Sequence, residues 1–210
     1  MYLPSKFQCQ DKREIRSLME SYPLATVITI VDNNPLISHL PMVVETGPNG
    51  DLVLIGHMSK ANPHSRHIKK SETTLIFHGP NAYITPKWYE QNDVPTWNYA
   101  VVHCKGLTKL ILDANGIQNC LKKLTHAAEK NSLDPWDFWL PDDLSDPTDL
   151  TTAIVGFEVT ISEINAKFKL SQNRSSVDRK GVIGGLGSRT DDNSKAIQNL
   201  IIANEAKKNG

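Results

Sequence analysis

The 210-residue sequence predicts a mainly β protein, an antiparallel barrel or sandwich with flanking helices. Two observations predict this class. In the first half of the chain, short apolar runs alternate with brief turn segments, which is typical of strands that pair with their neighbours in sequence. Near both ends, and once past the middle, apolar residues recur at spacings of three and four, which indicates helices. The length fits one large domain, or one domain with an extension.

The first expected helix begins near Asp11, where Glu14 three residues later resembles a capping box, and Pro23 ends it. The expected strands follow in order at residues 24–31, 36–44, 52–55, 74–77, 82–85 and 99–112. Segments rich in Asp, Asn, Gly and Pro are expected to turn the chain at residues 32–35, 47–51 and 78–81. This order describes a meander of antiparallel strands.

A second amphipathic helix is expected over residues 117–128. The acidic and aromatic segment 134–149 is expected to be an ordered connection that packs three aromatic side chains against the body, those of Trp136, Phe138 and Trp139. A strand is expected over 154–161, and residues 164–170 either extend or follow it.

Two helices are expected at the C-terminal end of the chain. Ser175 with Asp178 is expected to cap a short helix. Four glycines are expected to break that helix and form a flexible joint: Gly181, Gly184, Gly185 and Gly187. Their spacing fits neither a dinucleotide-binding loop nor a P-loop. The last helix carries three apolar residues: Ile197, Leu200 and Ile201.

Composition narrows the function classes. The 23 basic and 23 acidic side chains give a formal charge of zero, so overall charge indicates neither a nucleic acid nor an anionic membrane as partner. No apolar run approaches the ~20 residues that span a bilayer, and the N-terminus lacks a signal-peptide core. The three cysteines, Cys9, Cys104 and Cys120, form no CxxC pair. We therefore expect a cytoplasmic protein without a disulfide framework.

The segment 54–68, LIGHMSKANPHSRHI, joins the end of an expected strand to a helix start. Asn62 followed by Pro63 is typical of an N-cap and a first helical position. Ser59, Lys60 and Asn62 would then surround free backbone N–H groups at the positive end of the helix dipole, where a phosphate-sized anion is well placed. The alternative is a surface turn with an ordinary cap.

Six segments resemble the PaiB family of FMN-binding proteins, which is also described as a family of negative transcriptional regulators. They are MYLPSKF at the start, SHLPMVV at 38–44, GHMSKANPH at 56–64, FHGPNAYITPKWY at 77–89, VPTWNYAVVHCKG at 94–106 and FKLSQNRSSVDRKGVIGGL at 168–186. The resemblance implies the FMN-binding split β-barrel that pyridoxamine phosphate oxidases and small flavin reductases share. It also implies a homodimer with the flavin in a groove between subunits. We expect the barrel over residues 1–170 and a C-terminal helical extension over 171–210.

The resemblance makes FMN the expected cofactor and gives the anion site a ligand, the flavin phosphate, held by Ser59, Lys60 and Asn62. His39 on the preceding strand is expected near the phosphate or the ring edge. Trp97 and Asn98 are expected to offer an aromatic wall and an amide to the isoalloxazine. The KLSQNR segment is expected to add Lys169, Gln172 and Arg174 at the dimer groove. The plainer alternatives are a packed loop aromatic for Trp97, a core histidine for His39, and a solvated turn for the KLSQNR segment.

Two function classes remain open: a PaiB-type negative transcriptional regulator, and an FMN-dependent oxidoreductase of the flavin reductase or pyridoxamine phosphate oxidase type. In the second class the flavin would carry the chemistry, and no catalytic side chain is expected. Direct DNA contact follows from the family description but not from the charge, since no basic recognition helix is visible. Two basic clusters could contact DNA, one at Arg66, Lys69 and Lys70 and the other at Arg174, Arg179 and Lys180.

Histidines raise the question of a metal or a haem. His64 and His67 are three residues apart, a separation that can ligate zinc, but no carboxylate or cysteine pair accompanies them. We expect no metal site. Haem ligation through His57 or His103 in place of a flavin is left open, because some relatives of the split barrel bind haem.

Overall fold

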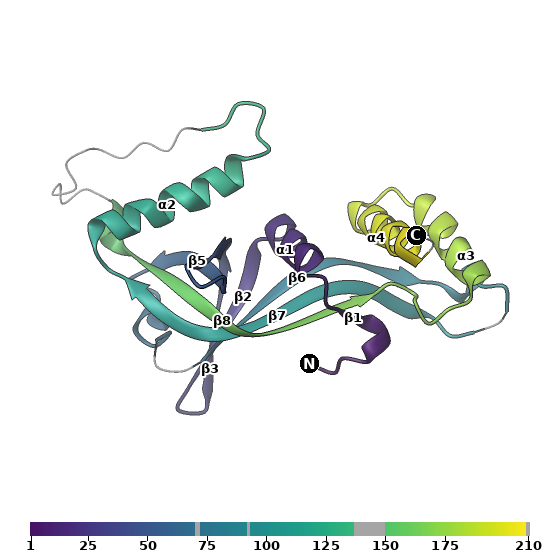
Figure 1. The fold of residues 1–210 in the computed structure, drawn as a ribbon, viewed down its shortest axis with the longest axis horizontal. Coiled ribbons are helices and arrows are strands. Elements are labelled where there is room, and N and C mark those ends of the chain that lie inside the picture. The colour runs from purple at the N-terminus through teal and green to yellow at the C-terminus, as the bar shows by residue number, and fades with distance from the viewer. Residues whose placement is uncertain (70–71, 92, 137–149, 209–210) are drawn as a thin grey trace. The chain divides into compact units, whose positions relative to one another are not determined.

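The computed structural model describes residues 1–69, 72–91, 93–136 and 150–208. The chain divides into two compact units. Unit 1 comprises Met1–Ser21, His78–Val102 and Asn165–Gly210, and unit 2 comprises Tyr22–Phe77 and His103–Ile164. Three long strands contribute residues to both units (Figure 1).

The strands are β1 Gln8–Cys9, β2 Leu24–Val31, β3 Asn34–Pro41, β4 Val43–Thr46, β5 Leu52–Ser59, β6 Thr73–Ile84, β7 Thr96–Ile111 and β8 Ile154–Lys169. They are hydrogen-bonded in the order β3-β2-β6-β7-β8-β5-β4, and β1 pairs with β8. The helices are α1 Lys12–Ser21, α2 Ala114–Glu129, α3 Ser176–Gly187 and α4 Asp192–Lys208, with 3-10 turns η1 Ser5–Phe7, η2 Pro63–Arg66, η3 Pro86–Trp88 and η4 Leu150–Ala153. The predicted mainly β class is confirmed.

Unit 2 is built around the hairpin of β2 and β3. Its turn has two residues with left-handed backbone, Asp32 at φ 49° and Asn33 at φ 63°, as the tight hairpin turn that matches strand twist requires. Helix α2 packs against β4 and β5, and Asp113 caps it by accepting a 2.7 Å hydrogen bond from the Gly116 N–H. The core of the unit is apolar: Val27, Leu54, Met58, Ile68, Leu75, Phe77, Cys104, Ile117, Phe157 and Val159.

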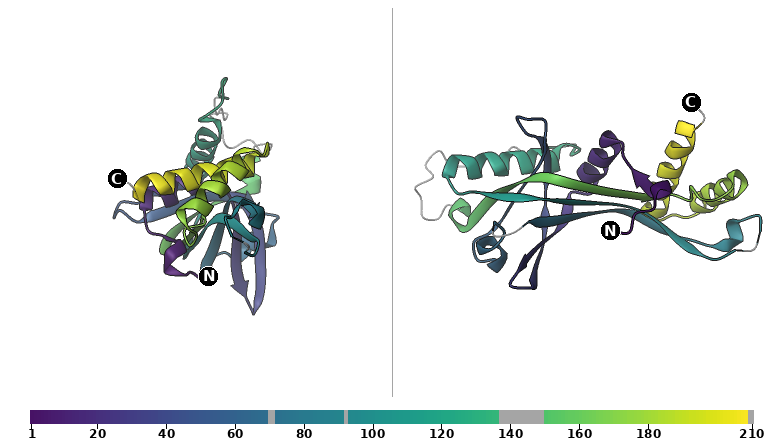
Figure 2. Two further views of the ribbon diagram at one scale, coloured as in Figure 1. Left: turned by 90° about the vertical axis from the view of Figure 1, so that its right-hand side faces the viewer. Right: turned by 60° about the horizontal axis from the view of Figure 1, so that its bottom comes forward.

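Unit 1 combines α1, α3 and α4 with β1 and with parts of β6, β7 and β8. Helices α3 and α4 lie side by side in every view (Figure 1, Figure 2). Alternate strand residues and the apolar faces of the helices form its core: Leu18, Met19, Ile84, Ala100, Phe168, Leu170, Val182, Leu186, Ile197 and Ile201.

Two strand predictions were wrong in their boundaries. The expected strand 36–44 is two strands, because the Met42 N–H donates to Pro23 O at 2.9 Å and the chain changes its partner there, from β2 to β5. The expected turn at 78–81 is instead the middle of β6. Pro80 fits within a strand because the pairing with β2 ends at Phe77, so its missing N–H costs no ladder bond on that side.

The prediction that four glycines break the helix after Ser175 was wrong, because α3 continues through them to Gly187. A Cβ at Gly185 would lie 2.1 Å from Cε2 of Trp88, and one at Gly181 would lie 2.0 Å from the Trp88 carbonyl oxygen. The Arg189 guanidinium lies 4.7 Å from the centre of the same indole. The glycines therefore let Trp88 of η3 dock directly on the backbone of α3, a contact between segments about a hundred residues apart that local spacing could not reveal.

The aromatic connection was expected to pack three side chains. Trp136 is 58% exposed, so that expectation fails for this residue. Phe138 and Trp139 lie outside the described residues. Residues 154–161 and 164–170 form the single strand β8, one of the two arrangements expected.

Candidate functional site

The end of β5 in unit 2 presents the predicted anion-binding residues. Ser59 and Lys60 are exposed. The Lys60 N–H donates to Ala153 O at 2.8 Å and the Lys60 ammonium donates to Thr152 O at 2.6 Å, so two bonds fix this segment against η4. The lysine makes no ion pair with a carboxylate of the described residues.

Asn62 joins this stretch to a buried polar chain. Its Oδ1 accepts from the His64 N–H at 3.0 Å, which confirms the predicted N-cap. Its Nδ2 donates to Ser38 Oγ at 3.0 Å, and Ser38 Oγ lies 3.0 Å from His64 Nδ1. The Ser38 hydroxyl therefore accepts from the Asn62 amide and also lies within hydrogen-bond distance of the His64 ring. The His64 Nε2 is buried without a partner among the described residues.

The helix that follows Asn62 is shorter than expected. It is the four-residue 3-10 helix η2, so the free N–H groups and the dipole of a full α-helix are not present there. An anion at this strand end would depend on the Lys60 charge and on the Ser59 hydroxyl. Ser38 and His64 were missed as members of this group because Ser38 reaches it only through the packing of β3 against η2.

His39 is not brought to the same group. Successive residues of a strand point to opposite faces, and Ser38 is buried whereas His39 is exposed. The His39 Nδ1 instead lies 3.2 Å from the Thr26 hydroxyl on β2.

The remaining predicted residues lie together in unit 1, and three of them are held by internal bonds. Asn98 is fully buried and donates to Ser171 Oγ at 2.8 Å. Gln172 accepts from the Leu170 N–H at 2.7 Å and donates to Phe168 O. Arg174 pairs with Asp93 and lies 4.4 Å from the centre of the Tyr89 ring. They shape the turn that follows β8, where Ser171 has left-handed backbone at φ 62°.

Trp97 and Lys169 are the two members of this set whose side chains do not take part in the bonds that hold the turn. Trp97 is 54% exposed, and its ring lies edge-on to Tyr83 with 6.1 Å between centroids. The Lys169 ammonium donates to Thr96 Oγ1. Burial, with the charges of Lys167 and Arg174, lowers the pKa of Lys169. Lys167 was missed by sequence reasoning, although its spacing of two from Lys169 on a strand is the signal of a shared face.

The described residues give little indication of a metal site or of a reactive cysteine. Among the described residues no group of three or more His, Cys, Asp or Glu side chains is arranged to hold a metal ion. Burial raises the pKa of Cys104 to about 12 and that of Cys120 to about 11, which disfavours their thiolates at neutral pH. No helix within the described ranges is long and apolar enough to cross a membrane.

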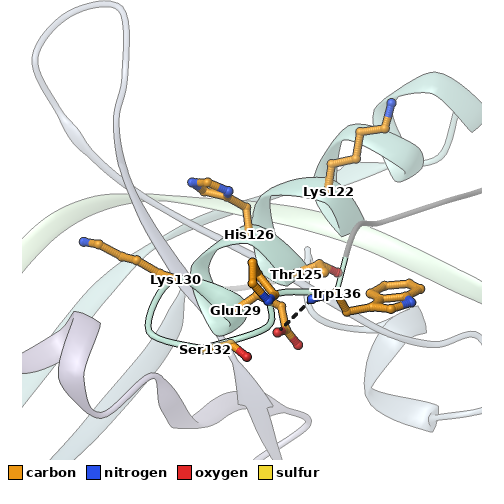
Figure 3. A pocket seen from close by; sticks show the side chains of 8 residues that line it. Lys122, Thr125, His126, Glu129, Lys130, Ser132 and Trp136 are labelled. Atoms are coloured by element: carbon orange, nitrogen blue, oxygen red, sulfur yellow. Dashed lines mark hydrogen bonds between the residues drawn. The ribbon is translucent and has the colours of Figure 1, made fainter.

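A surface hollow beside α2 is shown in Figure 3. Its lining includes Lys122, His126 and Trp136, and the Trp136 N–H donates to Glu129 Oε2 at 3.1 Å. None of the nine predicted cofactor residues lines it.

Acid should destabilise the protein through its buried histidines. Burial, with the charge of His67, lowers the pKa of His64 below its usual 6.5, and burial lowers that of His57. Below pH ~6.5 the unfolded chain takes up protons that the native chain does not, so we expect the free energy of unfolding to fall by up to about 1.4 kcal/mol per pH unit for each group until its native pKa is reached. Urea denaturation between pH 7.5 and 5 measures the slope, and His64→Gln should flatten it. An unchanged slope in that variant would contradict the assignment to His64.

Solved structures of two flavin-associated proteins share this fold. The FAD and heme binding protein from Mycobacterium smegmatis superposes with a TM-score of 0.59 at 16% identity, covering 77% of this chain and 73% of that one. The flavocytochrome Anf3 from Azotobacter vinelandii gives a TM-score of 0.60 at 17% identity, with 77% and 69% covered. At these identities the likeness concerns the fold alone, and the split-barrel class predicted from the sequence is confirmed.

Sequence relatives define the family. A family model described as "Putative FMN-binding domain" matches residues 1–163. The protease synthase and sporulation protein PAI 2 of Bacillus subtilis (strain 168) is 32% identical over 204 residues, which cover 96% of each protein. An uncharacterized protein of Emericella nidulans is 29% identical over 227 residues, covering 89% of this chain and 90% of that protein. The chain therefore belongs to the FMN-binding domain family, and its resemblance to the PaiB family is confirmed.

Proposed function

We propose that the protein binds FMN and that the flavin phosphate is held at the end of β5 by Ser59, Lys60 and Asn62. The observation that carries this proposal is the Lys60 ammonium, which is exposed, fixed by its bond to Thr152 O and without a carboxylate partner among the described residues. A charge-assisted hydrogen bond to phosphate is the interaction that such a group makes best. The family supports the choice of FMN among anions.

The residues around this strand end fit a phosphate monoester. The Ser59 hydroxyl and the Lys60 ammonium are donors on adjacent exposed residues, and the Asn62 amide is held in place by Ser38. Six further residues stay sequence predictions for the flavin, and the proposal places none of them beside the phosphate: His39, Trp97, Asn98, Lys169, Gln172 and Arg174. Of these, Asn98, Gln172 and Arg174 act by positioning, since their polar atoms already hold the turn after β8. Bound flavin would supply electron-transfer chemistry.

Titration of flavin-free protein with FMN tests the proposal. Quenching of flavin fluorescence should show saturable binding with one FMN per chain, in a homodimer that places the flavin between subunits. Absence of saturation at FMN concentrations up to the millimolar range would refute it.

The biological role that this flavin site serves is proposed to be regulatory, of the PaiB type. The relative that supports this role is PAI 2, whose name refers to protease synthesis and sporulation. An FMN-dependent oxidoreductase is the alternative, and the likeness to a flavocytochrome supports it only at the level of fold. Steady-state oxidation of NADH or NADPH by the FMN-loaded protein would favour the alternative.

Direct DNA binding by this chain should be weak. Of the C-terminal basic cluster, Arg174 pairs with Asp93 and Arg179 lies 2.8 Å from Glu205, which leaves few charges for phosphates. Lys70 of the other cluster lies outside the described residues. We expect a labelled duplex to bind at low salt, with little sequence preference, and to dissociate near ~0.15 M salt, because few counterions are released. Tight binding to one promoter fragment at that salt would contradict this expectation.

A further inference from the structure

One face of the strands in unit 1 carries aromatic rings and lysines together. We call it the aromatic–lysine face and define it by five residues: Tyr83 of β6, Trp97 and Tyr99 of β7, and Lys167 and Lys169 of β8. All five belong to the same compact unit. Neither the flavin phosphate group nor the surface hollow beside α2 includes any of them.

Strand geometry and two contacts place Lys167 and the three rings on one face, and the spacing of two on β8 adds Lys169. Lys167 and Lys169 are two residues apart on β8, as Trp97 and Tyr99 are on β7, and alternate residues point to the same side. The Lys167 ammonium lies 5.3 Å from the centre of the Tyr99 ring, which joins the two pairs. The rings of Tyr83 and Trp97 meet edge-on, which adds β6. Their neighbours in sequence, such as Ala100 and Phe168, are buried in the core.

The two lysines concentrate positive charge on this face, and no carboxylate of the described residues pairs with either. Lys167 is only 8% exposed, and its ammonium donates to Tyr2 O at 3.2 Å. Lys169 donates to the Thr96 hydroxyl. Neither lysine makes an ion pair within the described residues, whereas the nearby Arg174 is paired with Asp93. Two partly desolvated cations that repel each other cost stability unless an anion joins them.

We propose that the aromatic–lysine face binds a planar aromatic carboxylate, with the carboxylate between Lys167 and Lys169 and the ring against Trp97. The positive charge of the face favours an anionic ligand. The exposed indole, held edge-on by Tyr83, offers a flat surface on which an aromatic ring gains more than an aliphatic ring of the same size. The Tyr99 ring beside Lys167 completes a wall that keeps the ammonium partly out of water, which strengthens its attraction for a carboxylate.

The inference deepens the proposed function, since Trp97 and Lys169 are also among the groups assigned to the flavin site. It supplies the chemical class of a second ligand, which would compete with the flavin ring for Trp97. Its test uses flavin-free protein, so that absence of FMN binding and absence of aromatic acid binding are separate results.

Calorimetric titration with two matched acids tests the proposal. Benzoate and cyclohexanecarboxylate carry the same charge and have nearly the same size, but only benzoate is planar and aromatic. We expect benzoate to bind roughly three to ten times more tightly. Benzyl alcohol, an aromatic compound without the charge, should not bind measurably. In Trp97→Leu the two acids should bind equally.

Variants of the lysines separate a binding role from a structural one. Lys167→Met and Lys169→Met keep the aliphatic stem and remove the charge, and each should weaken benzoate binding about tenfold or more. Lys180→Met, which removes an exposed lysine from α3, is the matched control and should leave the affinity unchanged. Without ligand, Lys169→Met should melt at the same or a higher temperature than the unaltered protein, because a repelled and partly buried charge is gone.

Three results would overturn the proposal. Unchanged benzoate affinity in both lysine variants would place the anion elsewhere. Equal affinities for the two acids in the unaltered protein would remove the role of the ring. Failure of both acids to bind to the folded, flavin-free protein would show that the face is not a carboxylate site.

Discussion

Gly185→Ala should lower the free energy of unfolding by about 3 kcal/mol, since overpacking a site where backbone and ring already touch forces displacements that cost this much. The added methyl group would lie 2.1 Å from Cε2 of Trp88 and 2.2 Å from Cδ2, well inside contact distance. The indole cannot simply move away, because the Arg189 guanidinium lies 4.7 Å from its centre. A fall in melting temperature of about 6–12 °C is expected for a chain of this size.

Gly184→Ala is the matched control on the next residue of the same helix. A Cβ there meets nothing within 4 Å, so the substitution should be neutral or stabilise the helix by about 0.5–1 kcal/mol. Combining Gly185→Ala with Trp88→Leu should recover part of the loss, because the smaller side chain leaves room for the methyl group. Equal melting temperatures for the two alanine variants would show that the contact between Trp88 and α3 does not form as described.

These glycines illustrate where sequence reasoning fails in this fold. Periodicity predicted the class, the strand 24–31 to the residue and the capping roles of Asn62 and Ser175, because each depends on neighbours in sequence. A glycine that breaks a helix and one that admits a distant ring look the same in a local window. Only the contact with Trp88 distinguishes the two cases, and Trp88 lies 97 residues before Gly185. Pro80 similarly indicates a turn until the end of the β2 pairing is known.

The candidate site, like the fold, could be predicted from the sequence only in part. The strand end that presents Ser59 and Lys60 was predictable from an apolar run followed by a cap. Ser38 and His64 were not, because they meet through the packing of β3 against a 3-10 turn, which spacing does not encode. Lys167 was missed because its burial, which the sequence does not show, is what distinguishes it from an ordinary strand lysine. Contacts of this kind depend on tertiary structure and not on local propensity.

Lys60→Ala should reduce the affinity for FMN by about ten- to a hundredfold, because a charge-assisted hydrogen bond to phosphate contributes roughly 1.5–3 kcal/mol. Folding should survive. The bond from the Lys60 N–H to Ala153 O does not depend on the side chain, and Thr152, whose carbonyl loses the ammonium, is exposed to water. Fluorescence titration of both proteins at equal salt measures the change.

Riboflavin distinguishes loss of the phosphate contact from general damage, since it carries the same ring without the phosphate. It should bind the unaltered protein and Lys60→Ala with equal affinity, whereas a distorted site would weaken both flavins. Lys69→Ala removes another exposed charge, beyond η2, and should leave the FMN affinity within about twofold, because an exposed charge outside the site contributes only a screened, long-range attraction. If well-folded Lys60→Ala binds FMN as tightly as the unaltered protein, the phosphate is held elsewhere, and the end of β5 is only a capped surface turn.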